Sequence, residues 1–247
     1  MTHDVGKVSE RWFSINGAKM QTLTDTGRTS AYRGISTRRH SAPSRSELVR
    51  RSVDLVLATL ALAFFLPLMV LVALAVLLQD RGPILYAHDR VGRDGRVFKC
   101  LKFRSMLVDS DARLAKLLAE SSEARAEWDR DHKLRHDPRI TALGSFLRRS
   151  SLDELPQLFN VLAGDMSLVG PRPIVASEVR RYGRRFGHYC SVRPGITGLW
   201  QISGRNDVSY RRRVAIDTCY AQRQSLALDL RILIATVPSV LLRKGSY

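Results

Sequence analysis

Two adjacent carboxylates, Asp153 and Glu154, are the residues of this sequence best suited to do chemistry. Two arginines, Arg148 and Arg149, precede them, and a third, Arg172, follows further along the chain between two prolines. The flanking prolines fix the backbone, which lowers the entropy cost of presenting a guanidinium fork to a phosphate. Carboxylates beside fixed cations, downstream of a long apolar segment, predict phosphate chemistry at a membrane surface.

The same carboxylates have a structural alternative, because Ser151-x-x-Glu154 matches the capping box that begins many helices. With Ser151 as the N-cap, however, Pro156 would lie past the first turn and cost a helical hydrogen bond. A helix that begins at Asp153 keeps Pro156 within the first turn, where its missing N–H is harmless. Either start places Asp153 at a helix N-terminus, where the helix dipole favours negative charge. From these residues alone, catalysis and capping both stay open.

A basic β-hairpin is predicted for the stretch ILYAHDRVGRDGRVFKCLKF, with Asp94-Gly95 as its turn. Three cations, Lys99, Lys102 and Arg104, interleave with apolar residues in and after its second strand. They form either a solvated face of the hairpin or a basic wall that meets a phosphate.

Two further arginines lie in turn-forming sequences, as Arg172 does. Arg193 precedes a Pro-Gly pair, and Arg205 stands between a glycine and Asn206. Each turn alone is a weak signal. Three arginine turns that follow a carboxylate pair indicate a phosphate site more strongly.

The apolar segment Leu55–Leu78 contains no charged residue. As a straight helix it would reach about 36 Å, enough to cross a hydrocarbon core of about 30 Å. Pro67 lies at its centre, where it removes a backbone hydrogen bond and is expected to kink the helix. Basic residues flank both ends, so the positive-inside rule places both ends in the cytoplasm. A re-entrant helix that bends at Pro67 satisfies both flanks, and a simple span is the alternative.

The remaining segments differ in composition. Residues 1–46 are polar and basic, and they are predicted to form a disordered tail. Helices are predicted for residues 109–131, 140–149 and 208–222. The stretch LALDLRILIATVPSVLL suits an amphipathic helix that lies in the membrane interface or packs on the domain.

The composition narrows the class of partner. Lys and Arg number 40 against 23 Asp and Glu, which gives a formal charge of +17. This excess implies an anionic partner, namely nucleic acid, an anionic bilayer or a phosphorylated substrate. Since no recognition-helix, RNA-motif or zinc signature is present, no nucleic acid is expected. The three cysteines, Cys100, Cys190 and Cys219, fit no metal or disulfide spacing and are expected to be unpaired thiols.

The run from DPRITALGSFLRRSSLDELPQLFNVLAGDMSLVGPRP to RPGITGLWQISGRNDVSY resembles the bacterial sugar transferases, also called monotopic phosphoglycosyl transferases. The similarity extends from about Arg50 to the C-terminus. The segments FKCLKFRSM and GRNDVSY and the terminal GSY are most similar to exopolysaccharide-production members, which hand galactose-1-phosphate to undecaprenyl phosphate.

This resemblance implies transfer of a hexose-1-phosphate, from galactose or glucose, out of a UDP-hexose to undecaprenyl phosphate with release of UMP. In the family an aspartate attacks the β-phosphorus and forms a covalent aspartyl-phosphosugar intermediate, which the lipid phosphate then attacks. By motif position the nucleophile is Asp153, and Glu154 is its partner at a Mg²⁺ ion that both carboxylates hold. The reaction would be the first membrane step in assembling an exopolysaccharide repeat unit. Further residues expected in the phosphate and nucleotide region are Lys102, Arg148, Arg172, Arg193, Arg205, Asn206 and Asp217.

The resemblance also implies an architecture. The expected fold class is α+β and mainly helical, in a membrane-associated monotopic protein with one re-entrant helical hairpin, interfacial amphipathic helices and a small β-hairpin or sheet. A tail at 1–46 would precede a re-entrant membrane helix at 47–81, broken at Pro67, and a cytoplasmic catalytic domain at 82–247. The expected location is the cytoplasmic face of the bacterial inner membrane, in contact with its lipids. Whether the chain forms a homo-oligomer stays open.

Two other functions compete with this hypothesis. A basic membrane-tethered protein that binds nucleic acid or anionic lipid would show no turnover, and removing Asp153 would have no consequence. A glycosyltransferase that moves the sugar alone would release UDP rather than UMP.

Overall fold

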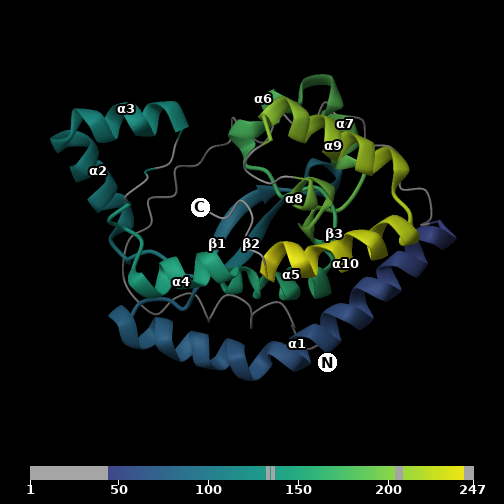
Figure 1. Cartoon of the computed structure of the whole chain (residues 1–247), viewed down its shortest axis with the longest axis horizontal. Helices are drawn as coiled ribbons and strands as arrows, with labels where there is room; N and C mark the ends of the chain where they lie inside the picture. Colours follow the sequence, from purple (N-terminus) through teal and green to yellow (C-terminus); the bar gives the residue numbers. More distant parts are fainter. Residues whose placement is uncertain (1–43, 132–133, 135–136, 204–207, 242–247) are drawn as a thin grey trace, which may run out of the picture. The chain divides into compact units, whose positions relative to one another are not determined.

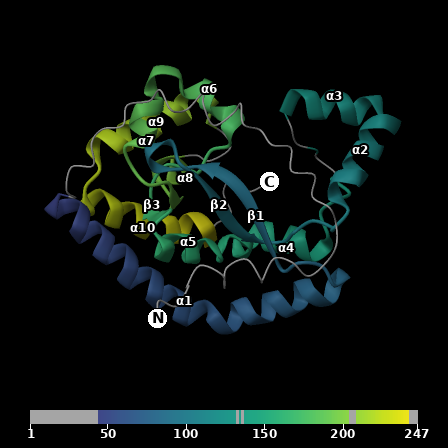
Figure 2. The same cartoon turned by 180° about the vertical axis from the view of Figure 1, so that it is seen from behind.

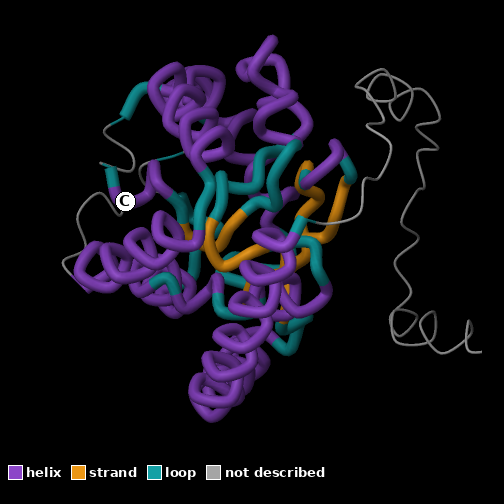
Figure 3. Tube along the Cα trace, turned by 90° about the vertical axis from the view of Figure 1, so that its right-hand side faces the viewer, coloured by secondary structure: helices purple, strands orange, loops and turns teal. Residues whose placement is uncertain are grey.

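The structure of the chain is a computed structural model that describes residues 44–131, 134, 137–203 and 208–241. Most of these residues are helical, and two small two-stranded sheets lie among the helices (Figures 1 and 3). This arrangement confirms the mainly helical α+β class that the sequence predicts. The predicted tail, residues 1–46, lies outside the described residues up to position 43.

The apolar segment forms one long helix, α1 (Arg45–Asp80). The Ser44 hydroxyl caps its start by accepting from the Glu47 N–H at 3.2 Å, and Arg81 ends it in a left-handed conformation with φ 51°. One stripe of the helix, including Ala58 and Val76, is buried against the domain. Most of its other apolar side chains are exposed, so the helix has the length and composition to enter a membrane.

Pro67 lies inside α1, and the helix continues through it without interruption. Figures 1 and 2 show that the helix bends along its length, as expected where a proline removes a hydrogen bond. The sequence predicted a break at Pro67 and a hairpin. The structure has one bent helix that continues through Pro67, because a single missing hydrogen bond kinks a helix without ending it, and the hairpin stays a prediction. How α1 runs relative to a membrane stays a prediction.

The predicted β-hairpin is confirmed. Strands β1 (Leu85–Val91) and β2 (Val97–Phe103) pair antiparallel, with Tyr86 opposite Lys102 and Val91 opposite Val97. The short 3₁₀ turn η2 (Arg93–Gly95) joins them. Two of its residues, Asp94 (φ 57°) and Gly95 (φ 72°), take the left-handed conformation that Asp-Gly turns tolerate.

A second sheet joins two distant arginine turns. Strands β3 (Ser167–Val169) and β4 (Gly195–Thr197) pair in parallel. Beyond the ladder, the Gly195 N–H donates to the Pro171 carbonyl at 2.9 Å, which ties the segment after β3 to the start of β4. The backbones approach so closely that a Cβ on Gly195 would lie 2.0 Å from the Gly170 nitrogen. Only glycine fits there, so the sheet depends on both glycines.

The charged stretch after the hairpin differs from the prediction of one helix over 109–131. It forms two helices, α2 (Ser110–Glu120) and α3 (Ser122–Asp131), which separate at Ser121. Ser121 adopts an extended conformation, and its hydroxyl accepts from the Ala124 N–H at 3.1 Å, which caps the start of α3. The next predicted helix is confirmed as α4 (Ala142–Ser150), capped by Thr141.

The C-terminal half packs short helices around the second sheet. These are η4 (Ala176–Glu178), α6 (Val179–Tyr182), η5 (Gly183–Arg185), α7 (Phe186–Cys190), α8 (Leu199–Ile202), α9 (Tyr210–Arg223) and α10 (Leu226–Leu241). Helix α9 matches the prediction for 208–222, and α10 matches the predicted amphipathic helix. Its Ile232 is buried in the core with Val169 and Tyr220, whereas Ile234 is exposed. The three cysteines are unpaired, as predicted.

Candidate active site

The two carboxylates lie in a tight turn between helices. Ser151 ends α4 in a left-handed conformation with φ 59°, and its N–H binds carbonyls of the last turn of α4. A 3₁₀ turn, η3 (Leu152–Glu154), follows, and α5 (Gln157–Ala163) begins only after Pro156. We call residues 152–154 the carboxylate turn.

This geometry corrects the capping-box interpretation. The Ser151 side chain makes no cap bond, because this residue already closes the preceding helix, and α5 starts later than either predicted position. Pro156 occupies the N-cap position of α5, where its missing N–H costs nothing. Asp153 and Glu154 are therefore not used as helix caps.

Lys102 of β2 reaches both carboxylates. Its ammonium nitrogen lies 2.6 Å from Glu154 Oε1 and 3.8 Å from Asp153 Oδ2. The position of the strand relative to the carboxylate turn is set by Asn160 of α5, which is buried. The Asn160 side chain accepts from the Leu101 N–H at 2.9 Å and donates to the Lys99 carbonyl at 2.8 Å. This amide joins α5 to β2, and its only signal in the sequence is a polar residue within an apolar helix.

The two carboxylates have different electrostatic environments. Burial raises the pKa of Asp153 to about 6, with Lys102 and Arg148 opposing the shift and Glu154 adding to it. For Glu154, burial acts in the same direction, but the positive charges of Lys102 and Arg172 hold its pKa below the usual range. A buried carboxylate with a raised pKa beside an ionised one is an arrangement typical of functional sites.

Four cations surround the turn, and we call Arg90, Lys102, Arg148 and Arg172 the cation wall. The Arg148 Nε donates to the Ser105 hydroxyl at 2.8 Å, which fixes the guanidinium near Asp153. Arg90 donates to the Pro173 carbonyl at 3.1 Å, directly after Arg172. Burial and the nearby charge of Arg172 lower the pKa of Arg90, so the two guanidinium groups lie close enough to repel each other. An anion between them would relieve that repulsion.

The sequence interpretation missed Arg90, although a signal was present. Paired residues of an antiparallel hairpin share one face, and the Asp94-Gly95 turn sets the register. Arg90 lies opposite Phe98 and Lys102 opposite Tyr86, so both cations are on the same face of the hairpin.

Arg172 packs against a buried network that contains Trp200 and Arg213. Its guanidinium carbon lies 5.9 Å from the centre of the Trp200 ring, and that of Arg213 lies 4.8 Å from the same ring. Arg213 also approaches Asp217 at 3.9 Å. Asp217 accepts a hydrogen bond of 2.7 Å from the Tyr182 hydroxyl, and burial raises its pKa to about 6. Asp217, predicted near the nucleotide, therefore lies in the layer behind the cation wall.

Arg193 is not brought to the carboxylates. Its Nε donates to the Gly164 carbonyl at 3.0 Å, and another nitrogen lies 3.5 Å from Glu47 Oε1. It shares a hollow of about 440 Å³ with Arg93, beside the hairpin turn. Arg205 and Asn206 lie outside the described residues.

The carboxylates suit a magnesium ion by their chemistry. Among the described residues there is no group of three or more His, Cys, Asp or Glu side chains that could hold a metal. Mg²⁺ often binds through one or two carboxylates and completes its shell with water and substrate phosphates. Asp153 and Glu154 offer such oxygens, and because Lys102 occupies one oxygen of Glu154, Asp153 is the freer ligand.

Three relatives and a family profile place this site in context. The exopolysaccharide production protein ExoY of Sinorhizobium fredii is 50% identical over 198 residues, 80% of this chain and 88% of that protein. The undecaprenyl-phosphate galactose phosphotransferase of Salmonella typhimurium is 51% identical over 206 residues, 83% of this chain and 43% of that protein. The UDP-glucose:undecaprenyl-phosphate glucose-1-phosphate transferase of Xanthomonas campestris is 41% identical over 202 residues, 78% of this chain and 39% of that protein.

The chain thus spans less than half the length of several relatives that it matches, 43% in the Salmonella case. The family profile described as bacterial sugar transferase matches residues 45–243, which include α1, the carboxylate turn and the cation wall. With this match over most of its length, the chain belongs to the bacterial sugar transferase family.

Proposed function

We propose that this protein transfers a hexose-1-phosphate from a UDP-hexose to undecaprenyl phosphate and releases UMP. The observation that carries the proposal is Asp153, a buried carboxylate 3.8 Å from Lys102 and within the field of Arg148. Relatives at 50–51% identity are named for exopolysaccharide production and for galactose phosphate transfer to undecaprenyl phosphate. The product would be the first lipid-linked unit of an exopolysaccharide.

The reaction proceeds in two transfers at one site. In the first, an ionised oxygen of Asp153 attacks the β-phosphorus of the UDP-hexose, the bond from that phosphorus to the bridging oxygen breaks, and UMP leaves with the bond electrons. The hexose phosphate is then attached to Asp153 as an acyl phosphate. In the second, an oxygen of undecaprenyl phosphate attacks the same phosphorus and Asp153 departs, which restores the free carboxylate.

The cation wall makes this attack possible, since a carboxylate and a diphosphate repel each other in the absence of countercharge. Lys102 lies between the two carboxylates and can follow the charge as it moves to the leaving phosphate. Arg90 and Arg172 present two guanidinium groups near Glu154, and Arg148 lies near Asp153. A Mg²⁺ ion held by Asp153 and Glu154 would supply further positive charge to the diphosphate.

Membrane contact is part of the proposal, because the acceptor is a lipid. The bent helix α1 enters the cytoplasmic leaflet of the inner membrane and returns to the same face. Exposed apolar side chains on three other helices would rest in the interface, namely Phe146 on α4, Phe159 on α5 and Ile234 on α10. The catalytic domain then lies in the cytoplasm, where the sugar nucleotide is available.

Galactose is the proposed sugar. The relatives named for galactose are 44–51% identical to this chain, whereas those named for glucose are 40–41% identical. The support for galactose is this higher sequence identity, because no described side chain is assigned to the hexose.

The test is the nucleotide released by the purified protein with Mg²⁺, undecaprenyl phosphate and either UDP-galactose or UDP-glucose. We expect UMP, a preference for UDP-galactose, and no release from the Asp153→Asn variant. UDP instead of UMP would mean ordinary glycosyl transfer. Binding of nucleic acid without turnover of either donor would favour a basic binding protein.

A further inference from the structure

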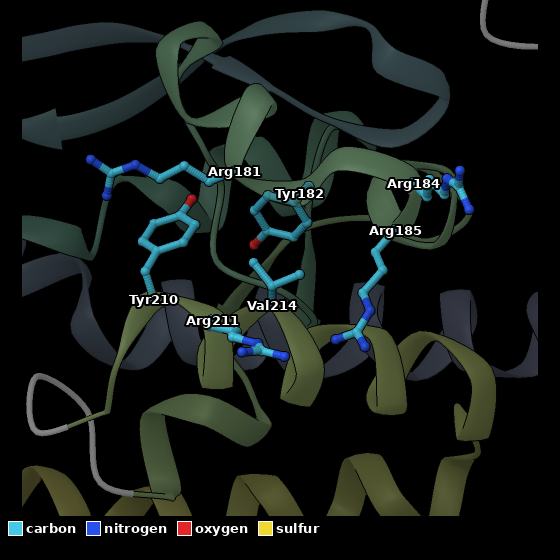
Figure 4. A pocket seen from close by; sticks show the side chains of 7 residues that line it. All are labelled: Arg181, Tyr182, Arg184, Arg185, Tyr210, Arg211 and Val214. Atoms are coloured by element: carbon cyan, nitrogen blue, oxygen red, sulfur yellow. The ribbon is translucent and has the colours of Figure 1, made fainter.

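A second hollow lies away from the carboxylate turn, between η5 and α6 on one side and α9 on the other (Figure 4). It has a volume of about 510 Å³. Four arginines line it, Arg181, Arg184, Arg185 and Arg211, and we call it the arginine pocket.

The positive charge of the arginine pocket has no paired carboxylate among the described residues. In the part of the chain that the structure describes, none of its four arginines lies within ion-pair distance of a carboxylate. The two nearby acidic side chains are already engaged, since Glu178 lies 3.7 Å from Arg213 and Asp217 accepts from Tyr182. Unpaired guanidinium groups around one hollow favour a multivalent anion between them.

The walls of the pocket are ordered by packing. Its floor is formed by Tyr182 and Val214, which are 3% and 4% exposed. On one side the Arg181 guanidinium lies 4.7 Å from the centre of the Tyr210 ring, which restrains that side chain. In Figure 4 the Arg185 side chain extends from η5 toward α9, the helix that carries Arg211. A ligand placed there would meet guanidinium groups from two separate elements.

The pocket differs from the cation wall in position and in surroundings. None of its residues is among the charges that shift the pKa of Asp153 or Glu154. It also lies far from the apolar helix: α1 packs on α5 and β3, whereas α6 and α9 lie on the opposite side of the hairpin and sheet (Figures 1 and 2). A ligand from the cytosol would reach this side more readily than a lipid headgroup would.

We propose that the arginine pocket is a binding site for a soluble anion that carries two or more phosphate groups. The guanidinium fork matches phosphate oxygens bidentately, and the pocket volume accommodates a molecule of nucleotide size. This site is separate from the proposed transfer reaction and does not depend on it.

The experiment measures binding of inorganic tripolyphosphate to the full chain in a zwitterionic detergent at 0.15 M salt, by calorimetry. The test variant is Arg185→Gln with Arg211→Gln. Its matched control is Arg180→Gln with Arg212→Gln, which removes the same charge from exposed neighbouring positions that do not line the pocket. We expect an affinity loss of about tenfold or more in the test variant and less than about twofold in the control, since only the former loses direct contacts.

Three further measurements complete the design. Lys102→Met should retain tripolyphosphate binding, because Lys102 belongs to the cation wall. Glycerol phosphate, the phosphate of a lipid headgroup, should bind at least about tenfold more weakly than tripolyphosphate, since one phosphate cannot bridge both elements. Polyglutamate, added at the same total negative charge, should not displace tripolyphosphate from the arginine pocket.

Equal losses in the two double variants would overturn the proposal, because binding would then follow the general positive field. Loss of binding in Lys102→Met would place the probe at the cation wall instead. Preference for glycerol phosphate would point to lipid, and preference for polyglutamate would point to an acidic protein.

Discussion

Two clusters of arginine and carboxylate side chains flank the β1–β2 hairpin, and their hydrogen bonds differ. At the hairpin turn, the arginines are occupied by the protein itself. Arg51 donates to the carbonyls of Val161 and Leu162 at 2.7 and 3.2 Å, and Arg193 donates to the Gly164 carbonyl. These bonds cap the C-terminal end of α5.

At the carboxylate turn, by contrast, the cations keep free donors. Among the described residues, the Lys102 side chain donates one hydrogen bond to Glu154, and the Arg148 side chain donates one to Ser105. Arg90 donates to the Pro173 carbonyl, and the charges of Arg90 and Arg172 both act on Glu154. Helix α5 connects the clusters, because the carboxylate turn precedes it and the hairpin-turn arginines hold its end. Similar arginine motifs therefore serve binding or scaffolding according to how many of their donors the backbone carbonyls already use.

The largest effect is expected for Asp153→Asn. An amide cannot act as the nucleophile, so UMP release should fall by roughly 10³-fold or more. Circular dichroism should show an unchanged fold. The matched control is Asp89→Asn, on the solvent side of β1, where the carboxylate pairs with the exposed Lys99 at 2.7 Å. Full activity of the Asp153→Asn variant would contradict the proposed mechanism.

The second prediction compares two lysine variants of strand β2, Lys102→Met and Lys99→Met. Loss of the Lys102 charge should reduce kcat/KM for the UDP-hexose by about 100-fold, since it removes a cation from the reacting phosphates. Lys99 is exposed and pairs with Asp89, so its variant should retain activity. A similar loss in both would indicate that the hairpin contributes only a general positive field.

Arg51→Met tests the scaffold cluster. Two hydrogen bonds from a charged donor should be lost, which lowers the free energy of unfolding by about 1.5–3 kcal/mol. Thermal unfolding in detergent should show a lower midpoint, while the KM for the UDP-hexose stays near its original value. Arg45→Met, at the exposed start of α1, serves as the control. A raised KM with an unchanged midpoint would mean that this cluster binds substrate.

The smallest expected effect is a shift in pH dependence. In the proposed mechanism Asp153 attacks as the ionised carboxylate, and burial raises its pKa to about 6. The rate should therefore fall about tenfold per unit as pH decreases below 6. Because Lys102 lowers the pKa of Asp153, Lys102→Met should move this acidic limb to higher pH, and Lys99→Met should leave it in place. An acidic limb near pH 4 in the original protein would contradict the buried environment of Asp153.

Local patterns in the sequence predicted much of the scaffold. The Asp94-Gly95 turn between extended runs predicted the hairpin, and the uncharged Leu55–Leu78 segment predicted α1. The single helix predicted for 109–131 was wrong at Ser121, because a serine can cap a new helix as readily as it continues an old one.

The sequence by itself determined the chemical types at the site: adjacent carboxylates, a rigid Arg172 and a basic strand with Lys102. These follow from composition and short spacing. Tertiary structure alone decided their partners. It placed Asp217 behind the cation wall and paired Arg193 with the Gly164 carbonyl, whereas the hairpin register already implied that Arg90 shares a face with Lys102. These pairings depend on which distant donors and acceptors come together when α5, the hairpin and the second sheet pack. Local sequence patterns do not specify such long-range partners.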